Sequence, residues 1–337
     1  MKEKLLQINR WMGNHVLIMA LLWLVLPAVF SSMDYVMHIL IMVAIYVMLA
    51  EGLNLVMGYG GQLQIGFAAF FGIGAYISGL LLVRTGWSFW PTLPLAFGGS
   101  FLIGGFIGLP SIRVRGDYLG IVTLGFGEIT RILLTNWDTL TNGPMGISGI
   151  PSPTLLGLNF GNKTLFFYMV TIFAAVCFFV MRRLVNSKFG FKLIAVSHDE
   201  SVAEVLGIRT GAVKIMAYAI SAGIAGFAGA VYASYFLFIS PDSFIFNDSL
   251  AMLCMVVVGG RGNIIGTAIG AVILTLAPEV FRFLGDYRML MYGVALTAMV
   301  IFKPMGLFGM DKRKRNVIVE TCEKKGLLEM LKKGVGI

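Results

Sequence analysis

Long apolar stretches separated by short polar segments recur along this chain of 337 residues. A helix needs about 20 mainly apolar residues to cross the hydrocarbon core of a bilayer. The longer stretches are 16–30, 35–56, 65–83, 89–109, 118–134, 165–181 and 213–238. Shorter stretches follow at 250–258, 264–276 and 289–302, the first two separated by GGRGN. This pattern predicts an all-α polytopic membrane protein with about ten transmembrane helices.

The composition excludes a water-soluble globule. Hydrophobic residues make up 58% of the chain and charged residues 13%, against about 45–50% and 25% in soluble domains. Mean hydropathy is +0.85. Three cysteines cannot form a disulfide framework, and two of them, Cys177 and Cys254, lie in apolar stretches.

The placement of basic residues predicts an orientation in the membrane. Lys and Arg gather in short cytoplasmic loops of membrane proteins. With ten spans and a cytoplasmic N-terminus, 21 of the 26 basic residues fall inside and four outside, while Arg131 lies within a span. Both termini are therefore predicted inside, and the first apolar stretch is interpreted as an anchor. The net charge of +9 then reflects orientation, and no nucleic-acid partner is expected.

The spans fall into two sets around a long inside segment. Spans 2 to 5 begin outside, whereas spans 7 to 10 begin inside, as an inverted repeat requires. We expect one transmembrane domain over residues 1–310, with its hydrophilic inside loop at 182–212, and a basic cytoplasmic tail at 311–337.

The inside loop contains AVSHDESVAEVLGIR at 195–209. Ser197 and Glu200 have the spacing of a capping box, which predicts that a short helix begins there. Gly207 is expected to end it. The residues of this segment are Ser197, His198, Asp199, Glu200, Val202, Glu204, Val205, Leu206 and Gly207.

This short helix has one apolar face, because Val202, Val205 and Leu206 recur at helical spacing. Acidic residues in its early turns suit the helix dipole. The residues leave two readings open. The helix either docks a soluble partner or packs on its own bundle.

Charged residues inside predicted spans are costly and are usually paired or functional. Glu51 is interpreted either as a route-lining or proton-accepting group or as a hydrated structural carboxylate. Glu128 and Arg131, at i and i+3, favour a structural ion pair over a proton relay. With Glu51 and Glu128, Gln62 and Gln64 are candidate polar positions along a route or its gates.

Rows of small residues predict close helix packing rather than dimer contacts. Gly262, Gly266 and Gly270 form GxxxGxxxG, and Gly226 lies in an Ala-Gly-Ala row at the same spacing. The dipeptide Gly-Lys is absent, so the chain has no Walker A motif and cannot itself be a P-loop ATPase. No HExxH or GxSxG motif occurs, and no enzymatic activity, metal or cofactor is expected.

Several sequence blocks together resemble one family, the permease subunits of branched-chain amino acid ATP-binding-cassette importers, in particular the LivM type. These blocks are GLNLVMGYGGQLQIGFAAFFGIGAYISG at 52–79, RVRGDYLGIVTLGFGEITRILLTN at 113–136, LTNGPMGISGIP at 140–151, the segment 195–244, VVVGGRGNIIGTAIGA at 256–271 and KPMGLFG at 303–309. Permeases for urea and short amides share much of this pattern.

The resemblance implies a multi-pass protein of a bacterial or archaeal cytoplasmic membrane. It implies three kinds of partner: a second, similar permease, two cytosolic ATPases that use ATP and Mg, and a soluble solute-binding protein outside. On this reading residues 198–207 are the coupling helix received by an ATPase.

Two other classes stay open as rivals. An ion-gradient-driven transporter would use Glu51 and Glu128 as proton or cation sites. A membrane-embedded enzyme would need a nucleophile, base or metal set, which the sequence does not supply.

Overall fold

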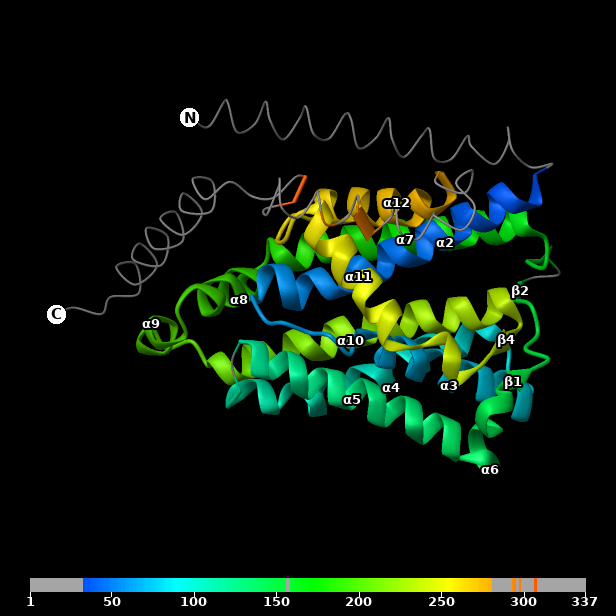
Figure 1. Ribbon diagram of the computed structural model, residues 1–337, viewed down its shortest axis with the longest axis horizontal. Coiled ribbons are helices and arrows are strands. Elements are labelled where there is room, and N and C mark those ends of the chain that lie inside the picture. The colour runs from blue at the N-terminus through cyan, green and yellow to red at the C-terminus, as the bar shows by residue number, and fades with distance from the viewer. Residues whose placement is uncertain are drawn as a thin grey trace.

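The computed structural model describes residues 33–114, 116–155 and 158–280, together with residues 293, 294, 297, 306 and 307. Most helices run along the long axis of one bundle (Figure 1). The long helices are α2 (Asp34–Asn54), α3 (Phe67–Arg84), α4 (Phe89–Gly108), α5 (Asp117–Asn136), α7 (Lys163–Val185), α10 (Thr210–Phe236), α11 (Phe246–Gly259) and α12 (Ile264–Val280).

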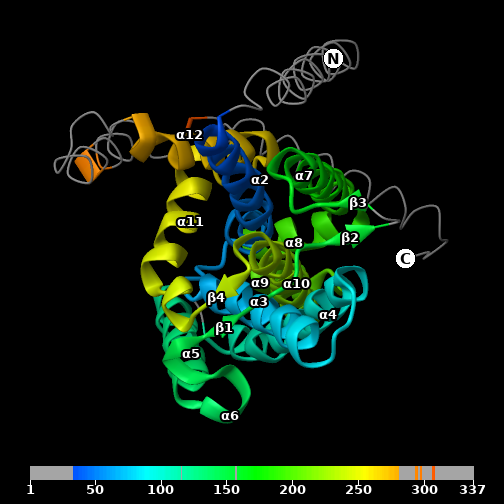
Figure 2. The same ribbon diagram turned by 90° about the vertical axis from the view of Figure 1, so that its right-hand side faces the viewer.

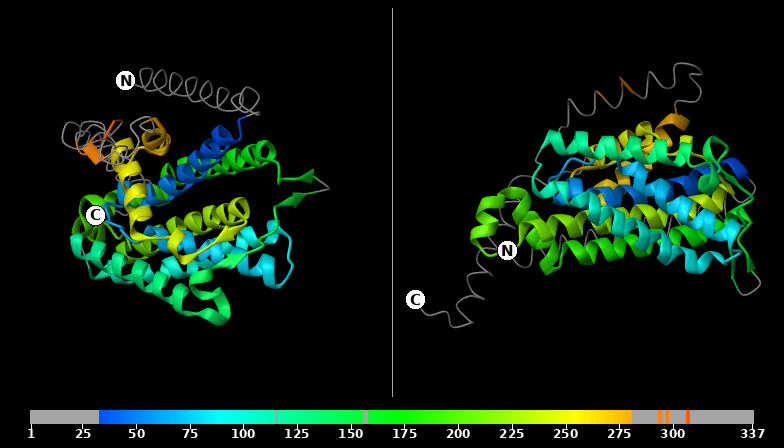
Figure 3. Two further views of the ribbon diagram at one scale, coloured as in Figure 1. Left: turned by 45° about the vertical axis from the view of Figure 1, so that its right-hand side comes forward. Right: turned by 90° about the horizontal axis from the view of Figure 1, so that it is seen from below.

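Short elements occupy the two ends of the bundle. One end carries α8 (Lys188–His198) and α9 (Glu200–Val205), and the other carries α6 (Asp138–Thr141) and four two-residue strands (Figures 1 and 3). The strands form two antiparallel pairs: β1 (Ile147–Ser148) with β4 (Phe238–Ile239), and β2 (Thr154–Leu155) with β3 (Leu158–Asn159). Short 3-10 helices are η2 (Pro110–Ile112), η3 (Gly143–Met145) and η4 (Pro241–Ser243).

Eight of the predicted spans correspond to helices of the described chain. Seven described helical segments are long and apolar enough to cross a membrane, and α12 is a shorter apolar helix. The predicted break at 259–263 is present as the turn between α11 and α12. The first and tenth predicted spans, at 16–30 and 289–302, fall wholly or mostly outside the described residues, as does the tail at 311–337. The mostly helical, polytopic membrane class is confirmed, and the count of ten, the orientation and the repeat stay predictions.

Helix α10 lies at the centre of the bundle, where α3, α4, α2 and α7 pack around it (Figure 2). Its buried positions are mostly small residues, including Ala217, Ala225, Ala228 and Gly229. Small side chains let neighbouring backbones approach closely. Helix α10 approaches α4 closely at Gly226, where an added Cβ would lie 2.1 Å from Ser100 Oγ.

The predicted glycine row at 262–270 is only partly helical. Gly266 and Gly270 lie on α12 and pack against Gly259 of α11, where an added Cβ on Gly270 would lie 2.6 Å from the Gly259 Cα. Gly262 lies in the preceding turn with φ of 74°, so its assignment to a helix-packing row is wrong. Its N–H instead donates to Asn54 Oδ1 at 3.0 Å, which ties the turn to the end of α2.

Two breaks interrupt the helical bundle. Helix α2 continues as a π-helix, η1 (Leu55–Tyr59), and residues 60–66 then run without helical structure to the start of α3. The N–H of Ile65 donates to Thr123 Oγ1 of α5 at 3.0 Å, which compensates for one lost helical bond. The second break, residues 237–245, separates α10 from α11 and contains β4 and η4.

We expect Gly226→Ala to destabilise the protein by about 1–3 kcal/mol or more, because the new methyl group would overlap α4. The neighbours are Ser100 Oγ at 2.1 Å and the Ala96 carbonyl oxygen at 2.7 Å. The thermal midpoint of the detergent-solubilised protein measures the effect. Gly125→Ala on α5 is the matched control, because its Cβ would meet no atom within 4 Å. An equal midpoint for both variants would contradict this packing.

Candidate functional site

The polar loop at one end of the bundle folds into two short helices. Ser187 caps α8, since its side chain accepts the N–H of Phe189. Leu193 of α8 is buried against Gly60, so α8 rests on the first break. Helix α8 runs to His198, and α9 begins only at Glu200.

The predicted cap of α9 is wrong by two residues. Ser197 lies in the last turn of α8 and donates to the Ile194 carbonyl at 2.8 Å. Asp199 caps α9 instead, because its Oδ1 accepts the N–H groups of Ser201 and Val202 at 2.9 and 3.1 Å. A carboxylate at this position also suits the helix dipole.

The C-terminal end of α9 is closed by Gly207, as the sequence predicts. Gly207 has φ of 78°, a region that glycine adopts without steric cost. Its N–H bonds to the Glu204 carbonyl at 2.9 Å, and the N–H of Ile208 bonds to the Ala203 carbonyl at 3.0 Å. These two bonds constitute a Schellman motif, so both ends of α9 are defined.

A buried ion pair fastens α9 to the first turn of α10. Lys214 Nζ lies 2.6 Å from Glu200 Oε1, and the two side chains are 7% and 12% exposed. The same ammonium donates to the Ser111 carbonyl of η2 at 3.3 Å. Thr210 Oγ1 donates to Glu204 Oε1 at 2.8 Å. We call this group, Glu200, Glu204, Thr210, Lys214 and Ser111, the clamp.

The apolar face of α9 points away from the bundle. Val205 is 88% exposed, and Val202 and Leu206 are also exposed, whereas Ala203 on the opposite face is buried. Isolated exposed apolar residues are common, but three on one helical turn form a patch. The patch, Val202, Val205 and Leu206, is the apolar tip of α9.

Basic residues concentrate at the α8–α9 end. The described residues that lie on or beside its elements are Arg113, Arg182, Arg183, Lys188, Lys192, Arg209, Lys214 and Arg261. At the strand end, the described part of the chain holds Arg84, which donates to two α6 carbonyls, and Lys163, which pairs with Asp34 at 3.3 Å. The two ends therefore differ strongly in positive charge.

Three of the predicted route residues lie in the bundle interior. Glu51 on α2 is fully buried, as is Gln64 in the first break, and Gln62 is nearly so. Helices α7, α10, α11 and α12 enclose α2 around Glu51, so this carboxylate lies away from the surface, and both readings of its role stay predictions. Among the described residues, neither oxygen of Glu51 and neither polar atom of the Gln64 amide has a hydrogen-bond partner.

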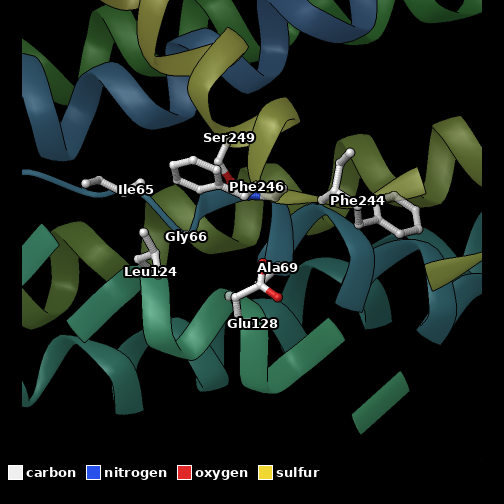
Figure 4. A pocket seen from close by; sticks show the side chains of 11 residues that line it. Ile65, Gly66, Ala69, Leu124, Glu128, Phe244, Phe246 and Ser249 are labelled. Carbon is white, nitrogen blue, oxygen red and sulfur yellow. Dashed lines mark hydrogen bonds between the residues drawn. The ribbon is translucent and has the colours of Figure 1, made fainter. Parts of the chain in front are cut away.

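Glu128 and Arg131 form the expected pair midway along α5. Arg131 Nε lies 3.0 Å from Glu128 Oε2, with 33% of the Arg131 and 37% of the Glu128 side chain exposed. Glu128 lines a crevice between α3, α5 and α11, and its carboxylate points into it (Figure 4). The other lining residues are Ile65, Gly66, Ala68, Ala69, Leu124, Gly127, Phe244, Ile245, Phe246 and Ser249.

The crevice is where the two breaks meet. Ile65 and Gly66 end the first break, and Phe244 and Ile245 end the second. The N–H of Ala68, in the first turn of α3, donates to Ser249 Oγ of α11 at 2.9 Å. Of the four predicted route residues, only Glu128 lines this crevice. In the described chain, no group of three or more His, Cys, Asp or Glu residues is arranged to hold a metal ion.

The apolar helices and the asymmetric distribution of positive charge are those of a polytopic membrane protein. Interrupted helices within such a bundle are typical of transporters. Residues 35–302 match the family described as the branched-chain amino acid transport system permease component. The chain therefore belongs to that family.

Characterised relatives agree with this assignment. The chain is 40% identical to the high-affinity branched-chain amino acid transport system permease protein LivM of Salmonella typhimurium, over 80% of this chain and 69% of that protein. Identity to LivM of Escherichia coli K12 is 39%, over 80% and 68%. Identity to the autoinducer 2 import system permease protein LsrC of Escherichia coli O157:H7 is 26%, over 89% and 88%. No solved structure matches the chain.

Sequence reasoning missed the clamp. In the sequence Lys214 was interpreted only as one of the basic residues on the inside. A lysine one turn into an apolar helix, however, needs a polar or charged partner. That partner, Glu200, lies 14 residues earlier, beyond any local pattern. The crevice was missed as well, because it combines three segments that are distant in sequence.

Proposed function

We propose that this chain is one of two permease halves of an ATP-driven importer for branched-chain amino acids in a prokaryotic cytoplasmic membrane. The apolar tip of α9, on a helix held at both ends and clamped to α10, is the observation that carries the proposal. Two cytosolic ATPases would hydrolyse ATP with Mg, a second permease would complete the route, and a solute-binding protein would deliver substrate. Membership of the permease family supports each of these roles.

The proposed orientation places the α8–α9 end in the cytoplasm and both termini inside, with ten spans. The concentration of Lys and Arg at that end supports this orientation, because positive charge is retained on the cytoplasmic side. The strand end, with its two antiparallel pairs, then faces the binding protein.

We further propose that the bundle is an inverted repeat of spans 2–5 and 7–10. In such a repeat α2 corresponds to α10, α3 to α11 and α4 to α12, and corresponding helices should make corresponding contacts. Thus α3 packs on α4 as α11 packs on α12, and α4 packs on α10 as α12 packs on α2. The two breaks also take equivalent positions, before α3 and before α11. This correspondence supports a repeat.

The clamp suggests how ATP hydrolysis would reach the route. An ATPase that moves the apolar tip would carry the first turn of α10 and η2 with it, because Lys214 contacts both Glu200 and the Ser111 carbonyl. Helix α10 packs against α3 and α4, so its displacement would shift the helices beside the crevice. Such a rigid-body shift alternates access to a fixed site.

Uptake measurements separate this proposal from an ion-gradient transporter. In liposomes holding the chain alone, a proton or sodium gradient is expected to drive no leucine uptake, because no ATPase is present. Liposomes with the second permease, both ATPases, ATP and the binding protein are expected to accumulate leucine. Gradient-driven uptake by the chain alone would overturn the proposal and favour transport through Glu51 and Glu128.

A further inference from the structure

The exposed surfaces of the membrane-spanning helices are not equivalent. Between their ends, the most exposed side chains of α4 and α7 are apolar and uncharged, among them Leu102, Phe106, Val176 and Phe179. Such surfaces suit contact with lipid. Helix α5 differs because Glu128 and Arg131 remain about one-third exposed on it.

The depth of this pair makes contact with lipid unfavourable. Glu128 lies about 16 Å along α5 from Asp117 at 1.5 Å per residue, hence near the middle of the span. Charged side chains at that depth normally face a bundle interior or a water-filled cavity. The face of α5 that carries the pair is therefore expected to border water or protein.

The crevice and the ion pair beside it together offer charged and apolar groups that complement those of an amino acid. Glu128, which lines the crevice, supplies a carboxylate. Arg131 lies outside the lining and supplies a guanidinium, whose Nε is 3.0 Å from Glu128 Oε2. Among described residues the pair makes no other side-chain bond. Ile65, Leu124 and Phe246 supply aliphatic and aromatic surface along the same crevice (Figure 4).

We propose that this crevice lines the translocation route and transiently holds a zwitterionic aliphatic amino acid when movement of the two breaks widens it, because in this structure it has room for about one water molecule. Its ammonium group would pair with Glu128, its carboxylate with Arg131, and its side chain would contact Leu124 and Phe246. This assignment rests on the proposed function and extends it by naming the site and the charge type of the substrate. It favours an amino acid over urea or a short amide, because an uncharged molecule makes no use of the two charges.

The position between the two breaks supports the assignment. Interrupted helices in corresponding positions of two repeats are the usual place of a transporter site. Residues from both breaks line the crevice, and the bond from Ala68 N–H to Ser249 Oγ joins the helices that follow them. Movement of either break would change the width of the crevice.

The decisive variant reverses the pair, with Glu128→Arg and Arg131→Glu together. The ion pair is retained, so a purely structural role predicts normal leucine uptake by the complete reconstituted importer. A substrate-binding role predicts uptake at least about tenfold slower, because each charge then faces a like charge of the zwitterion. Co-purification of both ATPases with this variant checks that the importer still assembles.

The control for folding reverses the exposed pair at the strand end, with Asp34→Lys and Lys163→Asp. Both reversed variants are expected to keep the thermal midpoint of the unaltered protein. Normal uptake by the Glu128–Arg131 reversal would overturn the inference while leaving the proposed function intact. An unaltered importer that neither assembles nor accumulates leucine would instead overturn the proposed function.

Thiol labelling tests the route without relying on the reversed variant. In a chain with Cys177, Cys254 and Cys322 replaced by Ala, Leu124→Cys is expected to react with a charged methanethiosulfonate in the assembled importer, and leucine transport to slow that reaction. Val176→Cys on α7 is the matched control, expected to be unreactive in lipid. Equal reactivity at both positions, or none at Leu124→Cys, would contradict the inference.

Discussion

Replacing Val205 by Asp is expected to abolish co-purification of the chain with its ATPase subunits and, with it, ATP-driven uptake. Val205 is 88% exposed at the apolar tip of α9, so the substitution costs little in the isolated fold. In a complex the same position would be covered, and a buried, unpaired carboxylate is strongly unfavourable. Loss of a central interface residue typically costs about 2 kcal/mol or more, or about 30-fold in affinity.

The control for this prediction is Met145→Asp, an exposed apolar residue of η3 at the opposite end. Its variant is expected to retain both ATPases. Leu206→Asp, on the same face as Val205, should behave like Val205→Asp. If Val205→Asp and Leu206→Asp both retained the ATPases and stimulated hydrolysis, the assignment of α9 as the coupling helix would be wrong.

Lys214→Met is expected to destabilise the protein by about 3–5 kcal/mol. The substitution removes the ammonium group of a buried ion pair, while the Glu200 carboxylate stays in the same buried place. The separation of 2.6 Å and the low exposure of both side chains place this pair well away from solvent screening. The thermal midpoint of the solubilised protein reports the change. Lys163→Met removes the cation of an exposed pair and should change stability by less than about 1 kcal/mol.

A second variant separates stability from coupling. Lys214→Met combined with Glu200→Leu removes both charges of the buried ion pair and is expected to recover much of the lost stability. The ATPases should still bind, since the apolar tip is intact, but uptake per ATP hydrolysed should fall. Uptake that stays tightly coupled in the double variant would show that the clamp does not transmit movement.

The sequence predicts the spans well because burial in lipid imposes a one-dimensional pattern. Every predicted span within the described residues corresponds to a helix, and even the turn at 259–263 follows from its glycines and polar residues. The apolar face of α9 was equally readable, since Val202, Val205 and Leu206 follow helical spacing. The ion pair of Glu128 and Arg131 was predicted for the same reason.

The failures occur where two local signals compete or where distant segments meet. Ser197 and Asp199 can each cap a helix, and the extra turn of α8 that buries Val196 decides for Asp199. Gly262 continues the spacing of Gly266 and Gly270, but its positive φ places it in a turn. Glu200 and Lys214, and the walls of the crevice, are brought together only by the tertiary fold.

The position of α10 has a thermodynamic consequence. Its first turn is held to α9 by the clamp, and its last residue, Phe236, is followed almost directly by β4, which pairs with β1 at the opposite end. A helix of 27 residues extends about 40 Å at 1.5 Å per residue. If a ligand at each end favours one placement of α10 over another, the two ligands must change each other's affinity by the same factor. Docking outside and ATPase engagement inside are therefore expected to be reciprocal, each strengthening or weakening the other equally.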